Sequence, residues 1–451
     1  MAKKETKSVT MTEGRISSLL IRFAIPLLLG NIFQQFYNMV DTWVVGNYVS
    51  NEAFSAVGTV GPVINMLIGL FLGLSSGAGV VVSQYYGGGK EDRVRDTVHT
   101  AVIMTFALAV LMTIAGLVLR PFLLSLMNTP AEVYKEADTY LTIYFIGVAG
   151  LLFYNIGASI LQGTGDSRHP FYFLATAAVM NIILDLVFVL VFGMGVEGVA
   201  WATILSQAVS AVLTMYTLMH VDTCVRLELK GMRFHSDIFS RIVHIGIPAA
   251  LQMAIISFSN IFVQAYINQF GADVMSGWTA YSKIDGLMLL PMQSIGLATT
   301  TFVGQNIGVG KVDRAKQGVR ISIGMSFIAT LVPMIPVLIF APDLVGFFNS
   351  KPEVVRWGSL FLYLISPFYV LSCPSNVFAC ALRGSGNTRG PMYIQIFSYV
   401  IFRQIYLFIM SNFIANQPIP IVMGYPAGWM VCTLCMFLYY RKVGIGPQTQ
   451  Y

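Results

Sequence analysis

Residues 161–170 read LQGTGDSRHP, and residues 382–391 read LRGSGNTRGP. The second stretch repeats the first 221 positions later, with glycine, a hydroxyl residue, glycine, Asp or Asn, arginine and proline in the same places. These residue types end one helix and begin the next, so turn and packing chemistry explains each match by itself. Further matches at the same distance indicate an internal duplication.

Two further pairs of segments supply those matches. GGGKEDR at 87–93 returns as GVGKVDR at 308–314, again 221 positions later, and RFAIP at 22–26 returns as HIGIP at 244–248, 222 positions later. Repeats that each contain six spans have the same topology and are related by an axis along the membrane normal. Transporters built in this way place their substrate site between two lobes near the bilayer midplane and open it alternately to each side.

The composition excludes an ordinary soluble protein. Of the 451 residues, 56% are hydrophobic and only 11% are charged, whereas soluble domains contain about 25% charged residues. The unbroken apolar runs suit membrane helices and lack the alternation of a membrane barrel. We therefore predict an all-α integral membrane protein with twelve transmembrane helices in two six-helix lobes.

The expected spans are 16–45, 54–84, 97–119, 139–161, 170–193, 198–219, 242–269, 276–305, 319–341, 357–381, 391–413 and 420–440. The expected domains are an N-lobe at 1–219, a cytoplasmic linker at 220–240 and a C-lobe at 241–451.

The basic residues predict the orientation of the spans. Of 27 lysines and arginines, 21 belong to the termini and to the loops on the side of the termini, and four belong to the opposite loops. The positive-inside rule therefore predicts that both termini are cytoplasmic in a multi-pass protein of the cell (inner or plasma) membrane. The same rule explains the basic isoelectric point, so nucleic acid is not an expected partner.

A polar stripe marks the first span. Asn31, Gln34, Asn38 and Asp41 lie on one helix face because they follow one another at steps of three or four. A central Asp costs roughly 2.5–3.5 kcal/mol on membrane-insertion scales, so the stripe is expected to face protein or water. In the second half the stripe is lost except for Asn260.

The fifth span has the same asymmetry between the halves. Asn181 and Asp185 lie one turn apart, whereas their counterparts 221 positions later are Phe402 and Tyr406. Thr203, early in the sixth span, corresponds to a glycine. Function is expected where the halves differ, so the ionisable groups of the first half are the candidates.

Removal from water disfavours the charged form of a carboxyl group, and a second carboxyl group nearby strengthens the effect. Asp41 and Asp185 could therefore hold a proton at neutral pH, or bind Na⁺ with neutral oxygens from Asn181 and Thr203. Either ion could bias a lobe between two states through differential affinity. Pro26 is a candidate hinge in the first span. We expect no other metal and no cofactor.

Other polar residues inside the spans are candidate substrate contacts. Asn38 and Asn260 occupy matching positions in the two halves. Lys283 could face a cavity or pair with a carboxylate, and Arg403 could pair or extend to the membrane interface.

These residues resemble those of the multidrug and toxic compound extrusion (MATE) family of the MOP superfamily. The early proline and Asp of the first span, the GGGKEDR loop and the QGTGDSRHP segment carry the resemblance over nearly the whole chain. The resemblance implies a two-lobe exporter of amphipathic, often cationic compounds, driven by H⁺ or Na⁺.

The resemblance also assigns residues. It implies a DinF-like cation site in the N-lobe at Asp41, Asn181, Asp185 and Thr203, and it matches Gln34 and Asn155 more loosely to polar cavity positions. Some family members have acidic residues in the seventh and tenth spans, but residues 242–269 and 357–381 contain none here. A C-lobe cation site of that kind is therefore not expected.

The predicted function is a cation-coupled antiporter for small molecules, working as a monomer in the lipid bilayer. A lipid or lipid-linked oligosaccharide flippase of the same superfamily and a major-facilitator exporter are the alternatives. A channel fits two symmetric lobes less well. An enzyme is disfavoured because the five histidines lack ligand spacing, and Gln84 and Glu91 break a phosphate-loop pattern around Lys90.

Overall fold

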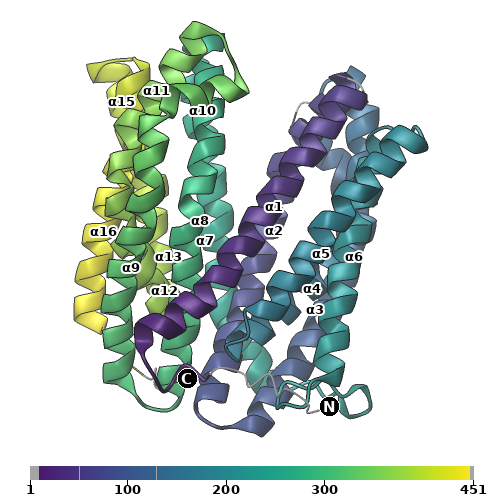
Figure 1. The fold of residues 1–451 in the computed structure, drawn as a ribbon, viewed down its shortest axis with the longest axis vertical. Helices are drawn as coiled ribbons and strands as arrows, with labels where there is room; N and C mark the ends of the chain where they lie inside the picture. Colours follow the sequence, from purple (N-terminus) through teal and green to yellow (C-terminus); the bar gives the residue numbers. More distant parts are fainter. Residues whose placement is uncertain (1–9, 50, 128, 447–451) are drawn as a thin grey trace. The chain divides into compact units, whose positions relative to one another are not determined.

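The structure is a computed structural model that describes residues 10–49, 51–127 and 129–446; these residues form helices and connecting turns, without a strand (Figure 1). The helices of the first half are α1 (Ile16–Tyr48), α2 (Asn51–Gly87), α3 (Glu91–Leu126), α4 (Ala131–Gly163), α5 (Arg168–Leu186), the π-helical η1 (Val187–Val191) and α6 (Val196–His220). The short 3-10 helix η2 (Leu229–Gly231) follows. Those of the second half are α7 (Ser236–Asn268), α8 (Ala272–Gly308), α9 (Val312–Ile339), α10 (Ala341–Phe348), α11 (Pro352–Ile365), η3 (Ser366–Phe368), α12 (Tyr369–Gly384), α13 (Arg389–Ile396), η4 (Phe397–Phe402), α14 (Arg403–Ile409), η5 (Met410–Ile414), α15 (Pro418–Val422) and α16 (Gly424–Val443).

Within the described residues, twelve helical segments are long and apolar enough to cross a membrane, which confirms the predicted all-α membrane class. Several run beyond the predicted apolar windows. The third, for example, was expected at 97–119 and covers Glu91–Ser125. Its first turn contains Glu91 and Asp92, which favour a helix N-terminus electrostatically but add nothing to an apolar window.

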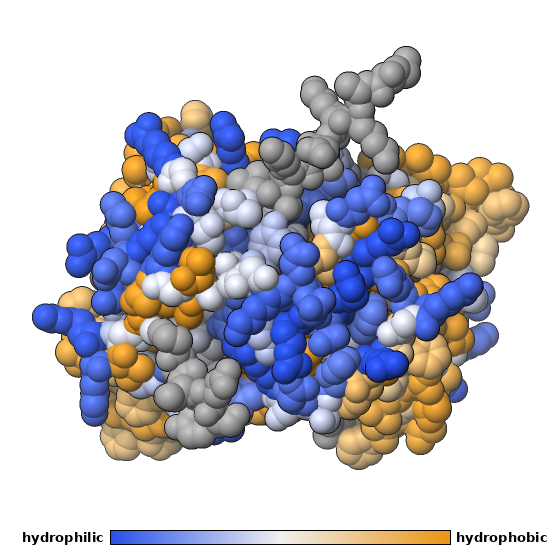
Figure 2. All heavy atoms as spheres, turned by 90° about the horizontal axis from the view of Figure 1, so that it is seen from below, coloured by the Kyte–Doolittle hydropathy of each residue, from blue (hydrophilic) through white to orange (hydrophobic). Residues whose placement is uncertain are grey.

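The outer helices have the surface that a bilayer requires. On α3 the exposed side chains include Phe106, Leu111, Ile114, Val118 and Phe122. On its counterpart α9 they include Ile328, Val332, Ile335 and Ile339. Figure 2, seen from below, shows many hydrophilic side chains together, with hydrophobic ones beside them. Apolar flanks and a polar end are expected when lipid replaces water around the helices.

The chain forms two compact units, and each unit borrows a short segment from the other half of the sequence. The first unit contains Ile25–Gly246, and the second contains Met11–Ala24 together with the chain from Ile247 on. The predicted division was 1–219, 220–240 and 241–451, so the first unit extends through the predicted linker. The two changes of unit fall inside α1 and α7, next to Pro26 and Pro248.

The two units repeat the same helix neighbours. In the first unit α4 packs against α2, α3 and α6; in the second, α12 packs against α8, α9 and α16, and α11 also packs against α8. Since α8 corresponds to α2, α11 and α12 to α4, and α16 to α6, the pairs are equivalent. The duplication seen in the sequence therefore extends to the packing.

The repeated LQGTGDSRHP segment encodes a helix end followed by a helix start. Gly165 adopts a φ of +91°, which glycine tolerates and other residues rarely adopt, and the N–H of Asp166 donates to Leu161 O at 3.0 Å. The Asp166 carboxylate then accepts hydrogen bonds from the N–H groups of Arg168 at 3.0 Å and His169 at 3.2 Å, as a helix cap does. In the second half Gly386 has a φ of +96°.

The first glycine of the same segment allows two helices to touch. A Cβ atom on Gly163 would lie 2.8 Å from the carbonyl oxygen of Gly79 on α2. Gly384, its counterpart, lies in the same way against the carbonyl oxygen of Thr300 on α8. Only glycine fits at this crossing in either unit.

The repeated loop at 87–93 holds the first segment of α7, which begins at Ser236. Arg93 forms an ion pair with Asp237 at 3.0 Å, and Arg241 donates a hydrogen bond to Gln84, close to the start of the loop. The segment is thereby fixed to the first unit.

The matching loop at 308–314 holds the segment that leads into α1. Lys311 donates through Nζ to the carbonyl oxygen of Thr12 at 3.1 Å, and Arg314 donates to that of Gly14 at 2.8 Å. Arg93 and its counterpart Arg314 thus each bind a segment that comes from the other half of the sequence.

Candidate functional site

Two acidic side chains of the first unit meet in its interior. Asp41 on α1 is 9% exposed and Asp185 on α5 is fully buried. The helices pack side by side, with the rings of Phe33 and Phe171 6.1 Å apart between centroids. The carboxyl groups of Asp41 and Asp185 are close enough for the charge of one to act on the other. The structure therefore brings together the two residues that the sequence singled out on separate spans.

The polar atoms around this pair are incompletely paired. Oδ1 of Asp41, both carboxyl oxygens of Asp185 and both amide atoms of Asn181 are buried, and none has a hydrogen-bond partner among the described residues. Buried polar groups are nearly always hydrogen-bonded, and leaving them unpaired is costly. The arrangement is one that a proton or a small cation would complete.

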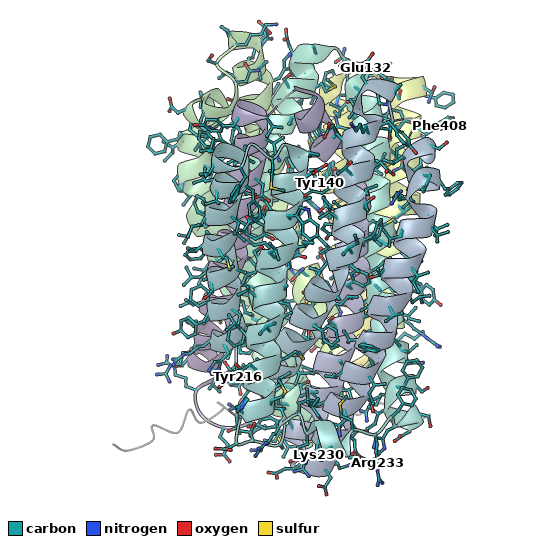
Figure 3. The ribbon with its side chains drawn as sticks, turned by 90° about the vertical axis from the view of Figure 1, so that its right-hand side faces the viewer. Glu132, Tyr140, Tyr216, Lys230, Arg233 and Phe408 are labelled. Carbon is teal, nitrogen blue, oxygen red and sulfur yellow. The ribbon has the colours of Figure 1, made fainter. Side chains whose placement is uncertain are left out.

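Tyr140, which was not predicted from the sequence, lies close to both Thr203 and the carboxyl pair. The hydroxyl of Thr203 donates to Val199 O at 2.9 Å and lies beside the hydroxyl of Tyr140, which is also close to both carboxyl groups. Figure 3 shows Tyr140 among the helices, between the end of α4 marked by Glu132 and the opposite end of the bundle. The counterpart of Tyr140 in the second half is Phe361, so the comparison between halves could have found it.

The helix geometry changes directly after the acidic residue of α5. The α-helical part ends at Leu186, one residue after Asp185, and the π-helical η1 (Val187–Val191) continues the span. Single π-helical turns inside α-helices occur frequently at functional sites because they disturb the regular hydrogen bonding.

The predicted substrate contacts of the first unit come from α1 and α4. Gln34 is half-buried and lies beside Tyr37, and Asn38 is exposed on α1. Asn155 donates its amide to Leu151 O at 2.8 Å within α4, an interaction that keeps the side chain along its own helix.

The predicted substrate contacts of the second unit come from α7 and α8. Lys283 is exposed on α8, and Asn260 is exposed on α7, where it accepts a hydrogen bond from Arg403 at 2.8 Å. Arg403 was expected to pair or to extend to the interface. It is buried and forms no ion pair with a described carboxylate.

One acidic group of the second unit has partners that the sequence did not reveal. The Asp285 carboxylate accepts a hydrogen bond from the hydroxyl of Tyr281 at 3.2 Å and another from that of Tyr369. The position equivalent to the Asp41–Asp185 pair differs, because Val263 is fully buried there and the hydroxyl of Tyr406 donates to Pro420 O at 3.1 Å.

Twelve apolar helices in two repeated sets, with paired acids buried in one of them, define a polytopic membrane transporter. The family model described as MatE matches residues 26–187 and again residues 248–409. The chain therefore belongs to the MatE family. The two matched segments begin at the prolines where α1 and α7 change unit.

Relatives and solved structures extend over nearly the full length. The chain is 28% identical over 431 residues to the probable multidrug resistance protein YoeA of Bacillus subtilis (strain 168), covering 93% of this chain and 92% of that protein. It is 24% identical over 395 residues to a FAD transporter of Shewanella oneidensis, covering 86% of each. A solved structure from Pyrococcus furiosus, described as a MOP superfamily transporter whose binding pocket has reverse polarity, matches with a TM-score of 0.92 at 25% identity, covering 98% of both chains.

Proposed function

We propose that the protein is a secondary antiporter that exports amphipathic or cationic small molecules by alternating access, using H⁺ or Na⁺ as the coupling ion. The coupling site would consist of Asp41, Asn181, Asp185 and Thr203. The observation that carries the proposal is the proximity of two buried carboxyl groups, of which Oδ1 of Asp41 and both oxygens of Asp185 have no donor among the described residues.

Two adjacent carboxyl groups away from water do not both stay ionised without a positive charge between or beside them. A proton shared by Asp41 and Asp185 would remove one negative charge, as in other carboxyl pairs. A sodium ion would neutralise the pair with oxygen ligands, and Asn181 supplies a buried amide oxygen without a partner. Both ions are therefore compatible with the residues present.

Binding of the ion can drive movement only if the two states of the unit differ in ion affinity. Asp41 and Asp185 belong to different helices, so a shift of α1 against α5 would separate or join them. Pro26 interrupts the backbone hydrogen bonding of α1, fifteen residues before Asp41 and next to the boundary between the units. It is the proposed hinge for that shift.

The direction of transport and the setting complete the proposal. The Bacillus subtilis relative is a probable multidrug resistance protein, and this similarity supports export of unrelated small molecules. The excess of lysine and arginine in the loops on the side of the termini supports cytoplasmic termini in the cell membrane. A monomer suffices, because each chain contains both units.

The test is transport by purified protein reconstituted into liposomes, with a fluorescent cationic dye as substrate. We expect dye movement when either an inward Na⁺ gradient or an inward H⁺ gradient is imposed, and no movement without a gradient. Dye movement that persists at the same rate after every ion gradient has been collapsed would refute the coupling.

Replacing Tyr140 with phenylalanine is expected to weaken ion binding without abolishing transport. The change removes only the hydroxyl group, which lies beside Thr203 and close to the carboxyl pair. The ring, which packs in the core, is kept. The partner of this hydroxyl is the neutral Thr203 side chain, and loss of one neutral hydrogen bond corresponds to about a fivefold weaker affinity. The measurement is the ion concentration that gives half-maximal transport.

Tyr216→Phe is the matched control for this variant. Tyr216 is 58% exposed on α6, far along the bundle from Tyr140 in Figure 3. An unchanged half-maximal concentration in Tyr140→Phe would remove the tyrosine from the site.

A further inference from the structure

The second unit contains a buried positive charge with only neutral partners. Arg403, the first residue of α14, is 3% exposed. One of its terminal nitrogens, Nη2, donates to Ser259 Oγ and to Asn260 Oδ1, both at 2.8 Å. The guanidinium carbon lies 4.7 Å from the centre of the Tyr425 ring. The described residues provide no carboxylate that forms an ion pair with it.

The hydrogen-bonding capacity of this guanidinium is not exhausted. Its Nε is buried and has no partner among the described residues. Arginine stays charged in proteins, and its planar fork matches the two oxygens of a carboxylate or phosphate. A buried ionisable group in a membrane span is costly and by default marks a functional site. An oxyanion would supply both the missing charge and the missing acceptor.

The surroundings of Arg403 suit a ligand that also has an aromatic part. Asn260 is exposed, so the buried guanidinium lies next to an accessible position on α7. Tyr425, which covers one face of the guanidinium, belongs to a group of rings with Trp278 at 5.6 Å and Trp429 at 6.1 Å between centroids. Such rings pack well against another planar ring.

An acidic residue of α8 in the same unit is otherwise engaged. Asp285 accepts hydrogen bonds from two tyrosine hydroxyls, which satisfy it without the guanidinium. The charge is also specific to this half, because the residue 221 positions before Arg403 is Ile182. The equivalent span of the first half carries Asp185 instead, so the two units present opposite charges on corresponding helices.

We propose that the second unit binds the carboxylate or phosphate group of an aromatic solute at Arg403. This inference deepens the proposed function, because it adds zwitterionic and anionic aromatic compounds to the cationic ones expected as substrates. Ser259 and Asn260 orient the guanidinium, Nε and a neighbouring N–H bind the oxyanion, and the aromatic rings bind the planar part of the solute.

The experiment compares two dyes that differ at a single group, which is charged in one dye and neutral in the other. Rhodamine 110 has a free carboxylate, and rhodamine 123 is its methyl ester. Fluorescence polarisation with the full-length protein in a neutral maltoside detergent measures binding without any ion gradient. We expect wild-type protein to bind rhodamine 110 about tenfold more tightly, as expected for one charge-assisted hydrogen-bonded pair. Arg403→Met should reduce the ratio to about one, and Arg403→Lys should keep part of it.

Two control variants make the result specific. Arg356→Gln removes an arginine of the same unit that also lies over an aromatic ring, Trp357, but is exposed; it should leave the ratio unchanged. Tyr216→Phe, at an exposed position of the first unit, should also leave it unchanged. Binding is measured without any ion gradient, so the result does not depend on ion coupling. Failure of ion coupling and failure of the Arg403 site are therefore distinguishable.

A competition measurement keeps the proposal testable if Arg403→Met does not fold. Benzoate should displace rhodamine 110 from the wild-type protein, and benzamide should not. Equal affinities for the two dyes, or a preference that survives in Arg403→Met, would overturn the proposal. The proposal would also be overturned if Arg403→Met bound both dyes equally weakly and had a lower thermal stability. Arg403 would then only connect α7 and α14 structurally.

The alternative source of an oxyanion is a lipid headgroup. Binding is therefore repeated in nanodiscs of phosphatidylcholine with and without phosphatidylglycerol. A preference for rhodamine 110 that is equal in both supports a solute site. Loss of the preference in the presence of phosphatidylglycerol, together with stabilisation by that lipid that depends on Arg403, would assign the site to lipid and contradict the proposal.

Discussion

Asp185→Asn is expected to abolish gradient-driven efflux, to the level of liposomes without protein, while the protein is produced and folds normally. Asparagine has nearly the same size and polarity as aspartate, so the packing of α5 is retained. It cannot release a proton or neutralise Na⁺, however, so the ion no longer distinguishes the two states of the first unit. The measurement is dye efflux from proteoliposomes under an imposed Na⁺ or H⁺ gradient, with Asp41→Asn expected to behave in the same way.

The matched control is Tyr406→Phe. Tyr406 occupies the position that corresponds to Asp185 in the second half, and its loss removes a single hydrogen bond to Pro420 O. Efflux by this variant should stay close to wild type. Normal efflux by both Asp41→Asn and Asp185→Asn would contradict the assigned coupling site.

The second large effect is expected from adding one carbon atom to the repeated segment. Gly384→Ala places a Cβ atom on the carbonyl oxygen of Thr300, and the conflict is with backbone, so α12 and α8 must move apart. Overpacking of this kind typically destabilises by about 1–3 kcal/mol. We expect a melting temperature in detergent that is several degrees lower, and a lower yield of folded protein.

Gly163→Ala should destabilise the first unit for the same reason, through the carbonyl oxygen of Gly79. Gly324→Ala is the control, because Gly324 is exposed within α9 and a Cβ atom there meets nothing within 4 Å. In a helix interior this change alone contributes about 1 kcal/mol of stability. Equal melting temperatures for Gly384→Ala and Gly324→Ala would show that the helix crossing tolerates a side chain.

Much of the architecture could be predicted because membrane helices leave a strong signal in the sequence. Apolar length gives the spans, and three matches at offsets of 221 or 222 residues give the duplication. The segment at 161–170 was recognisable because its glycines, Asp166 and the proline each have a fixed role in ending or starting a helix. That α1 and α7 each begin in one unit and end in the other was not predictable. Hydropathy does not say which neighbours a span contacts.

The site was predictable only in part. Asp41 and Asp185 stand out because acids are costly in lipid, and their meeting follows from the packing of α1 against α5. Tyr140 and Tyr369 escaped notice because tyrosines are common near membrane interfaces, and their role depends on which way the hydroxyl points. The neutral surroundings of Arg403 likewise depend on the rotation of α7 and α14 about their axes, which no periodicity encodes.

The exchange of segments between the units has a consequence for biogenesis. Synthesis proceeds from the N-terminus, and domains usually fold in that order. A ribosome that has delivered all six spans of the first half has not yet delivered Ile238, Ile242 and Ile245, which are buried in the core of the first unit. Residues 11–24, in contrast, are made first and belong to a unit that is completed last. Folding of the two units is therefore interlocked, and neither half is expected to fold when the polypeptide is divided within 220–240 and the parts are expressed alone.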